Sequence, residues 1–172
     1  MFIRTRKLLS LFLAAVALGC VAAGTVAPAA MAASTPLTAQ QEDLVGAGFH
    51  MSSSINLAPG GQLDGVVHTW TTNWGLGFTG GVYVLLRNSE GSIIGVTQLH
   101  TYGVDAKSVF WGTSSRVDYF TEYFDPRVAQ ATTSLEIIQQ HTPKDRLPAI
   151  MAQVVQIYNA AHQTCQQLQL CN

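Results

Sequence analysis

The chain is 172 residues long, with nine Lys and Arg residues, ten Asp and Glu residues and a formal net charge of −1. Three of the basic residues lie within the first 33 positions, so the remaining 139 residues (172 − 33) carry a net charge of −4 (6 − 10). Nucleic-acid binding relies on clustered Lys and Arg side chains. Only Lys144 and Arg146 lie close together in this segment, which argues against a nucleic-acid partner. A segment of this length can form one domain with its own core, without a metal or many disulfides.

The first 33 residues have the pattern of a cleavable secretory signal peptide. A basic cluster at residues 4–7 precedes an uncharged run at 8–23, and small residues follow up to the expected cleavage site, after Ala32 or Ala33. We therefore expect a secreted or otherwise extracytoplasmic protein of the cell envelope. A retained membrane anchor and a lipid attached to Cys20 are the alternatives, but the apolar run is short for a membrane span.

Residues 34–62 are expected to form an N-terminal lead that precedes the main domain. Thr38 and Gln41 have the spacing of a capping box, which predicts a short helix over residues 39–45. Residues 51–61 are rich in Ser, Pro and Gly, which predicts a loop with at most a short edge strand.

From Leu63 onward the sequence predicts strands, because segments rich in β-branched and aromatic residues alternate with turn residues. The clearest element is a β-hairpin over residues 81–101, whose turn at 88–91 ends in a glycine that tolerates a positive φ. The short spacing favours a mainly β domain over residues 63–172, an antiparallel β-sandwich of immunoglobulin-like or similar type. The expected strands are residues 63–70, 81–87, 92–101, 108–112, 117–124 and 133–141.

The C-terminal segment predicts an amphipathic helix over residues 146–165 that packs on the sandwich. After Arg146 no residue carries a formal side-chain charge. A helix that binds a partner or a second copy of the chain is therefore the alternative to one that only covers a sheet. The expected apolar stripe comprises Leu147, Met151, Val154, Tyr158, Ala161 and Cys165, widened by Ile150 and Ile157.

Cys165 and Cys171 are expected to form a disulfide, because two nearby cysteines in an exported chain meet an oxidising environment. Bridged Cα atoms lie within about 7 Å, whereas six residues of continuous helix span about 9 Å. The helix is therefore expected to stop near Cys165, and the tail to fold back.

Sequence motifs of enzymes are scarce in this chain. It has no Gly-x-Ser-x-Gly elbow, and its glycine-rich stretch at residues 75–81 lacks the Gly-Lys-Ser/Thr of a phosphate-binding loop. This favours a non-enzymatic binding or interaction protein without a cofactor. We expect exposed aromatic residues to contact an extracellular protein or a carbohydrate, and we name Trp74, Trp111 and Tyr102 as candidate ligand-binding residues.

Three His-Thr dipeptides suggest a different function. His68, His100 and His141 each lie near the end of a predicted strand, and they would gather at one rim if their strands ran in the same direction. Three imidazoles can hold Zn²⁺ with a water in the fourth position, so a zinc-dependent hydrolase is one alternative. A self-associating structural protein of an envelope or matrix, built on contacts of the C-terminal helix, is the other.

Overall fold

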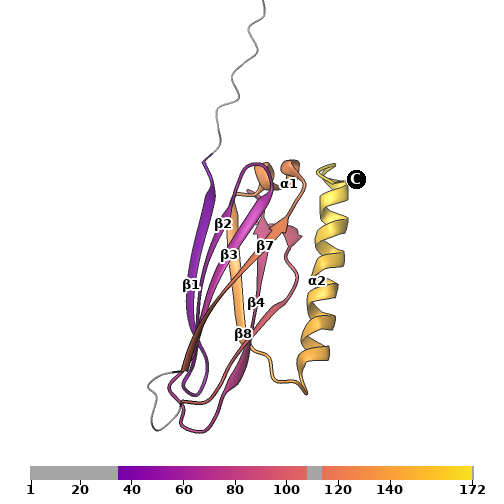
Figure 1. The fold of residues 1–172 in the computed structure, drawn as a ribbon. Helices are drawn as coiled ribbons and strands as arrows, with labels where there is room; N and C mark the ends of the chain where they lie inside the picture. The colour runs from indigo at the N-terminus through magenta and orange to yellow at the C-terminus, as the bar shows by residue number, and fades with distance from the viewer. Residues whose placement is uncertain (1–34, 108–113, 172) are drawn as a thin grey trace, which may run out of the picture. The chain divides into compact units, whose positions relative to one another are not determined.

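The computed structural model describes residues 35–107 and 114–171. This part of the chain is mainly β and forms two antiparallel sheets packed on each other, with a helix at the C-terminus (Figure 1), so the predicted sandwich with a C-terminal helix is confirmed. The predicted strand at 108–112 lies outside the described residues.

Sheet A has the strand order β1-β2-β3-β7, and sheet B is built around β4. β4 pairs with β8 along one edge and with β5 and β6, one after the other, along the opposite edge. The strands of sheet A are β1 (Leu37–Gly46), β2 (Phe49–Leu57), β3 (Gln62–Thr71) and β7 (Ser114–Tyr123). The strands of sheet B are β4 (Phe78–Arg87), β5 (Ile93–Val96), β6 (His100–Val104) and β8 (Ser134–His141), and the helices are α1 (Pro126–Ala131) and α2 (Leu147–Gln167).

The main core lies between the two sheets and follows from alternation along the strands. Successive side chains of a strand point to opposite faces, and in β2 and β3 the odd-numbered residues, such as Met51 and Val67, are buried while their neighbours are not. β4 is buried on both faces, which explains its continuous apolar run. Its Val82 and Val84 join the core between the sheets, whereas Tyr83 packs in a second cluster under α2.

The N-terminal lead differs from the prediction. Residues 37–57 form the hairpin β1–β2, and neither the short helix over 39–45 nor the loop over 51–61 is present, since β2 runs to Leu57 and only residues 58–61 turn. As strand residues, Leu37 and Ala39 pair with Leu57 and Ile55 and pack against the core. A capping-box spacing is a local preference that such long-range pairing overrides.

α2 packs along the outer face of sheet B, against β5, on the side of the sandwich away from sheet A (Figure 1). Val154, Ala161 and Cys165 are its buried residues, and Ile157 also packs on the sheet. Met151 and Tyr158, which were predicted for the same stripe, are instead exposed over about half of their surface. Neither helix of the described segments is long and apolar enough to cross a membrane.

α2 ends in a Schellman motif that brings the two cysteines together. Gln169 adopts a left-handed conformation, with φ at 58°, and its N–H bonds to the Gln166 carbonyl while the Leu170 N–H bonds to the Cys165 carbonyl. This turn reverses the chain, and Cys165 and Cys171 form the predicted disulfide with their Cα atoms 5.6 Å apart. The helix runs two residues further than expected because the reversal needs only one tight turn.

Candidate functional site

The three His-Thr histidines do not converge. His68 lies on the outer face of sheet A, where its Nε2 is 3.0 Å from the Ser115 hydroxyl, and His100 lies on β6 in sheet B, 2.7 Å from the Glu122 carboxylate. His141 ends β8 and packs on the Phe49 and Phe78 rings. Over residues 35–107 and 114–171, no group of three His, Cys, Asp or Glu side chains is placed to hold a metal ion.

The predicted zinc site therefore has no counterpart in the described structure. The prediction needed all three strands to lie in one sheet, but β3 belongs to sheet A while β6 and β8 belong to sheet B. In addition, His68 points out of the sandwich, whereas the His100 ring stacks on the core residue Phe120 at a centroid distance of 4.1 Å.

The candidate ligand-binding aromatics are also in different surroundings. Trp74 lies in the loop between β3 and β4, is 58% exposed and has the Lys107 Nζ 4.7 Å from its ring centroid. Tyr102 packs against the core, where burial and then the charge of Asp118 raise the pKa of its phenol to about 12. Trp111 lies outside the described residues. Of the two described candidates, only Trp74 offers its ring mainly to solvent.

The outer face of sheet A carries the largest set of outward aromatic side chains in the described segments. Strand register places these side chains in rows: Trp70 lies between His50 and Ser115, His68 between Ser52 and Val117, and Val66 between Ser54 and Tyr119. We call the apolar and aromatic half of this sheet the aromatic face. It consists of His50, Val66, His68, Trp70, Val117, Tyr119 and Tyr123.

Aromatic rings on this face stack on one another. The His50 and Trp70 rings are 4.9 Å apart between centroids and inclined by 7°, and the His68 and Trp70 rings are 4.5 Å apart and inclined by 24°. Tyr119 and Tyr123 are 75% and 76% exposed. Since they are four residues apart on one strand, their Cα atoms lie about 13 Å apart along β7. The two rings form separate platforms on the same face of the sheet.

A polar trough lies beside the aromatic face, over β1 and β2. Ser52 and Ser54 have short side chains and lie next to the longer Gln40 and Glu42, so the surface is hollowed along the two strands. The trough has a volume of about 310 Å³, and its lining residues are Gln40, Gln41, Glu42, Ser52, Ser53 and Ser54. Hydroxyl, amide and carboxylate groups therefore line one half of the sheet surface, and rings the other.

Charge on the outer face of sheet A is low and negative. Its outward positions include Glu42 and Asp64 but no Lys or Arg. Asp64 accepts hydrogen bonds from the Gln62 amide and the Thr121 hydroxyl. Arg116 has the opposite orientation on β7 and pairs with Asp118 at 2.6 Å. Apart from the imidazoles of His50 and His68, the described strand positions of this face carry no group that could neutralise an anionic ligand.

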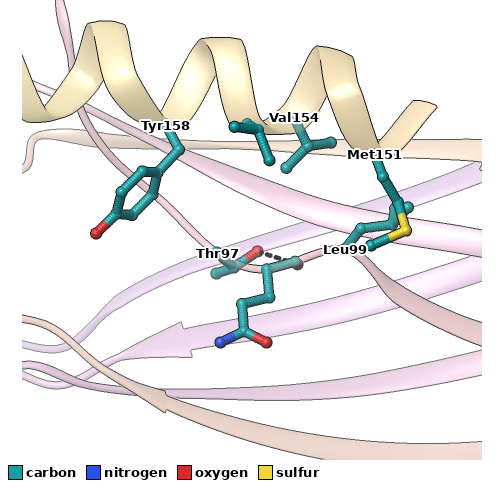
Figure 2. Close-up of a pocket in the computed structure, with 7 residues that line it drawn as sticks. Thr97, Leu99, Met151, Val154 and Tyr158 are labelled. Atoms are coloured by element: carbon teal, nitrogen blue, oxygen red, sulfur yellow. Dashed lines mark hydrogen bonds between the residues drawn. The ribbon is translucent and has the colours of Figure 1, made fainter. Parts of the chain in front are cut away.

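A second surface feature is an apolar groove between α2 and sheet B. β5 and β6 are separated by residues 97–99, where the Thr97 hydroxyl accepts the Val84 N–H at 2.9 Å in place of a backbone carbonyl. Figure 2 shows Met151 and Tyr158 projecting from the helix toward this interruption, at opposite ends of a pocket. The pocket has a volume of about 220 Å³ and is lined by Thr97, Gln98, Leu99, Met151, Val154, Val155 and Tyr158.

The groove continues into a more polar cleft of about 310 Å³, which shares Gln98 and Tyr158 with the apolar pocket. Glu122 lies in this cleft, but its carboxylate accepts both the Gln98 N–H at 2.8 Å and a hydrogen bond from His100. These bonds tie β7 to the interruption in sheet B. Glu122 therefore holds the two sheets together at this edge.

Sequence reasoning missed the aromatic face, although a signal for it was present. In residues 50–56 and 67–70, polar or aromatic residues alternate with residues that are buried in the structure. That alternation identifies the outward side of a strand once the strand itself is recognised.

Comparison of the chain with known protein families, with curated proteins and with solved structures found no significant match.

Proposed function

We propose that the chain is a non-enzymatic binding domain that acts outside the cytoplasm and holds a neutral carbohydrate on the outer face of sheet A. The observation that carries this proposal is the combination of exposed rings and a polar trough on one sheet face without Lys or Arg.

The rings suit the flat faces of sugar rings. A pyranose presents C–H groups on its faces, and these groups are attracted to the electron-rich face of an aromatic ring. Tyr119 and Tyr123 are the most exposed rings of the face. Because about 13 Å separates them along the strand, a ligand that contacts both must be longer than one sugar ring. The proposed ligand is therefore an oligosaccharide or a polysaccharide chain.

The trough suits the hydroxyl groups at the rim of such a ligand. Ser, Gln and Glu side chains offer both hydrogen-bond donors and acceptors on β1 and β2 of the same sheet. The lack of Lys and Arg on the face favours a neutral ligand over nucleic acid, anionic lipid or a sulfated glycan. A protein partner remains an outcome of the test below.

Export is part of the same proposal. The basic cluster and uncharged run of residues 4–23 support a cleaved signal, and the Cys165–Cys171 disulfide is compatible with an extracellular location. We expect the mass of protein recovered from the culture medium to correspond to a chain that starts after Ala32 or Ala33, with no free thiol. Protein that keeps residue 1 and stays in the cytoplasm with reduced cysteines contradicts this part of the proposal.

The binding test uses insoluble cellulose and chitin in pull-down assays, and soluble oligosaccharides of each in calorimetric titrations. The purified protein is expected to bind at least one of these glycans. Replacing either Tyr119 or Tyr123 by Ala removes an exposed ring without disturbing the core, and each change is expected to weaken binding by about tenfold, which corresponds to ~1.4 kcal/mol.

Trp74→Ala is the matched control, because it removes another exposed ring from a loop outside this face. Unchanged glycan binding by this variant assigns the site to sheet A. If Trp74→Ala abolishes binding and the tyrosine variants do not, the ligand is held by the loops instead. If neither glycan binds and a protein from the native surroundings is captured through the tyrosines, the carbohydrate proposal is wrong.

A further inference from the structure

We infer that the apolar side of α2 beside the groove is a contact surface for a second copy of this chain, so that the protein forms a reversible dimer. This inference does not depend on the proposed carbohydrate site, which lies on the other side of the sandwich.

α2 has a second apolar stripe in addition to the one that packs on sheet B. Met151, Val155 and Tyr158 are spaced by four and three residues, and 53%, 54% and 54% of their surfaces are exposed. This is the spacing of the positions that meet in paired helices. Val154 and Ile157 lie on the neighbouring side of the helix and make its apolar contacts with sheet B. The second stripe is therefore not needed for packing within the chain.

The absence of charge on α2 points to a like partner. Residues 147–172 contain no Asp, Glu, Lys or Arg, although exposed faces of helices usually carry them. A partner with a charged surface would find no opposite charge here and would lose hydration on contact. A second α2 brings no charge with it, and two such helices can approach without that cost.

We place the two helices antiparallel in the dimer. A two-fold axis that crosses them near the middle of the stripe brings the same patch of both copies into contact, as a closed dimer requires. The apolar pocket between α2 and sheet B (Figure 2) borders the stripe, and the helix of the second copy would cover it. Antiparallel helices also have opposed dipoles, which is favourable.

The proposed contact surface is small. α2 is about 32 Å long, and one helix face with a pocket of about 220 Å³ beside it makes a small interface. Interfaces at the small end of the range form transient complexes. We therefore expect a dissociation constant of micromolar order.

Sedimentation equilibrium of the purified protein over a wide concentration range tests the inference. The unmodified chain is expected to form a dimer reversibly. Val155→Glu places a charge in the centre of the proposed contact and is expected to weaken dimerisation by about 100-fold, because burial of an unpaired charge is costly. Gln153→Glu adds the same charge on the opposite exposed flank of α2 and is expected to leave dimerisation unchanged.

A mixture of variants identifies the partner as a second copy. Val155→Glu and Val155→Lys are each expected to be monomeric, and an equimolar mixture is expected to form heterodimers through the opposite charges. Circular dichroism shows whether each variant is folded. A chain that stays monomeric at concentrations of about 1 mM, or a Gln153→Glu variant as impaired as Val155→Glu, overturns the inference.

Discussion

A substitution at Gly65 tests directly how closely the two sheets pack on each other. It faces the core from β3 opposite Phe120 of β7, and the Phe120 ring lies across it. A Cβ atom at residue 65 would lie 2.8 Å from Cδ1 of that ring and closer still to Cε1 and Cζ. The ring stacks on His100, which is hydrogen-bonded to Glu122, so it cannot move aside without disturbing both.

Gly65→Ala is expected to destabilise the fold by about 1–2 kcal/mol. Overpacking of a well-filled core lowers the free energy of unfolding by about 1–3 kcal/mol. Ala loses less conformational entropy than Gly on folding, which offsets about 0.5–1 kcal/mol of this loss. Urea denaturation followed by circular dichroism measures the difference. Phe120→Leu in the same chain is expected to recover part of the loss, which a double-mutant cycle reports as a favourable coupling.

Two other glycines serve as controls for Gly65→Ala. Gly80→Ala would press on the thioether end of Met51, which is flexible, so a cost of about 0–1 kcal/mol is expected. Gly103→Ala meets nothing closer than Thr79 Oγ1 at 3.6 Å and is expected to be neutral or slightly stabilising. If the alanine at residue 65 is as well tolerated as the one at 103, the Phe120 ring does not lie over Gly65 and the reasoning fails.

Four further predictions concern stability. Gln169→Gly is expected to stabilise the protein by up to about 1 kcal/mol in thermal unfolding, because residue 169 has a positive φ that glycine adopts without strain; a loss of stability contradicts the Schellman geometry. Thr69→Val is expected to be neutral or stabilising by about 1 kcal/mol, since the buried Thr69 hydroxyl has no hydrogen-bond partner among the described residues. Thr97→Val is expected to cost about 1–3 kcal/mol, since it leaves the buried Val84 N–H without its acceptor; equal effects of the two threonine changes refute this account. The raised pKa of Tyr102, about 12 against 10.0 for a free phenol, favours the neutral phenol in the folded state. Its contribution to stability is therefore complete below pH 10 and is lost as the pH rises toward 12. Burial also raises the pKa of the Tyr83 phenol, so absorbance titration is expected to show two late-ionising tyrosines, of which Tyr102→Phe removes one.

Local sequence signals were sufficient for the hairpin of β4 and β5. Asn88 and Gly91 make the turn, in which the Asn88 side chain accepts the Glu90 and Ser92 N–H groups. The interruption after Val96 was not predictable, because it depends on the Thr97 hydroxyl replacing a backbone acceptor. A pattern of apolar residues does not indicate where a side-chain hydroxyl takes the place of a backbone acceptor.

Tertiary pairing explains the remaining differences. β1 and β2 have few apolar residues, and their strand structure becomes favourable only when β2 pairs with β3. The disulfide and the charge-free helix were predictable because they depend on neighbouring positions. The rotation of α2, which buries Val154 and exposes Met151, depends on the shape of sheet B beneath it. The aromatic face joins Trp70 to residues of β7 nearly fifty positions away, so it emerges only from the sheet register.

The two proposed surfaces lie on opposite sides of the sandwich, and this arrangement has a measurable consequence for binding. In a dimer built on α2, both copies would keep their sheet A faces open on the sides away from the contact, so that one dimer could bridge two neighbouring polysaccharide chains. A second contact made by an already bound dimer has a high effective concentration, so it strengthens binding to an insoluble glycan but not to a short soluble one. Val155→Glu is therefore expected to weaken retention on the insoluble polysaccharide at least tenfold, which corresponds to ~1.4 kcal/mol, while leaving the affinity for a soluble oligosaccharide unchanged. Tyr119→Ala is expected to weaken both. If Val155→Glu reduces the affinity for the soluble oligosaccharide as well, the groove beside α2 takes part in ligand binding and the two surfaces are not independent.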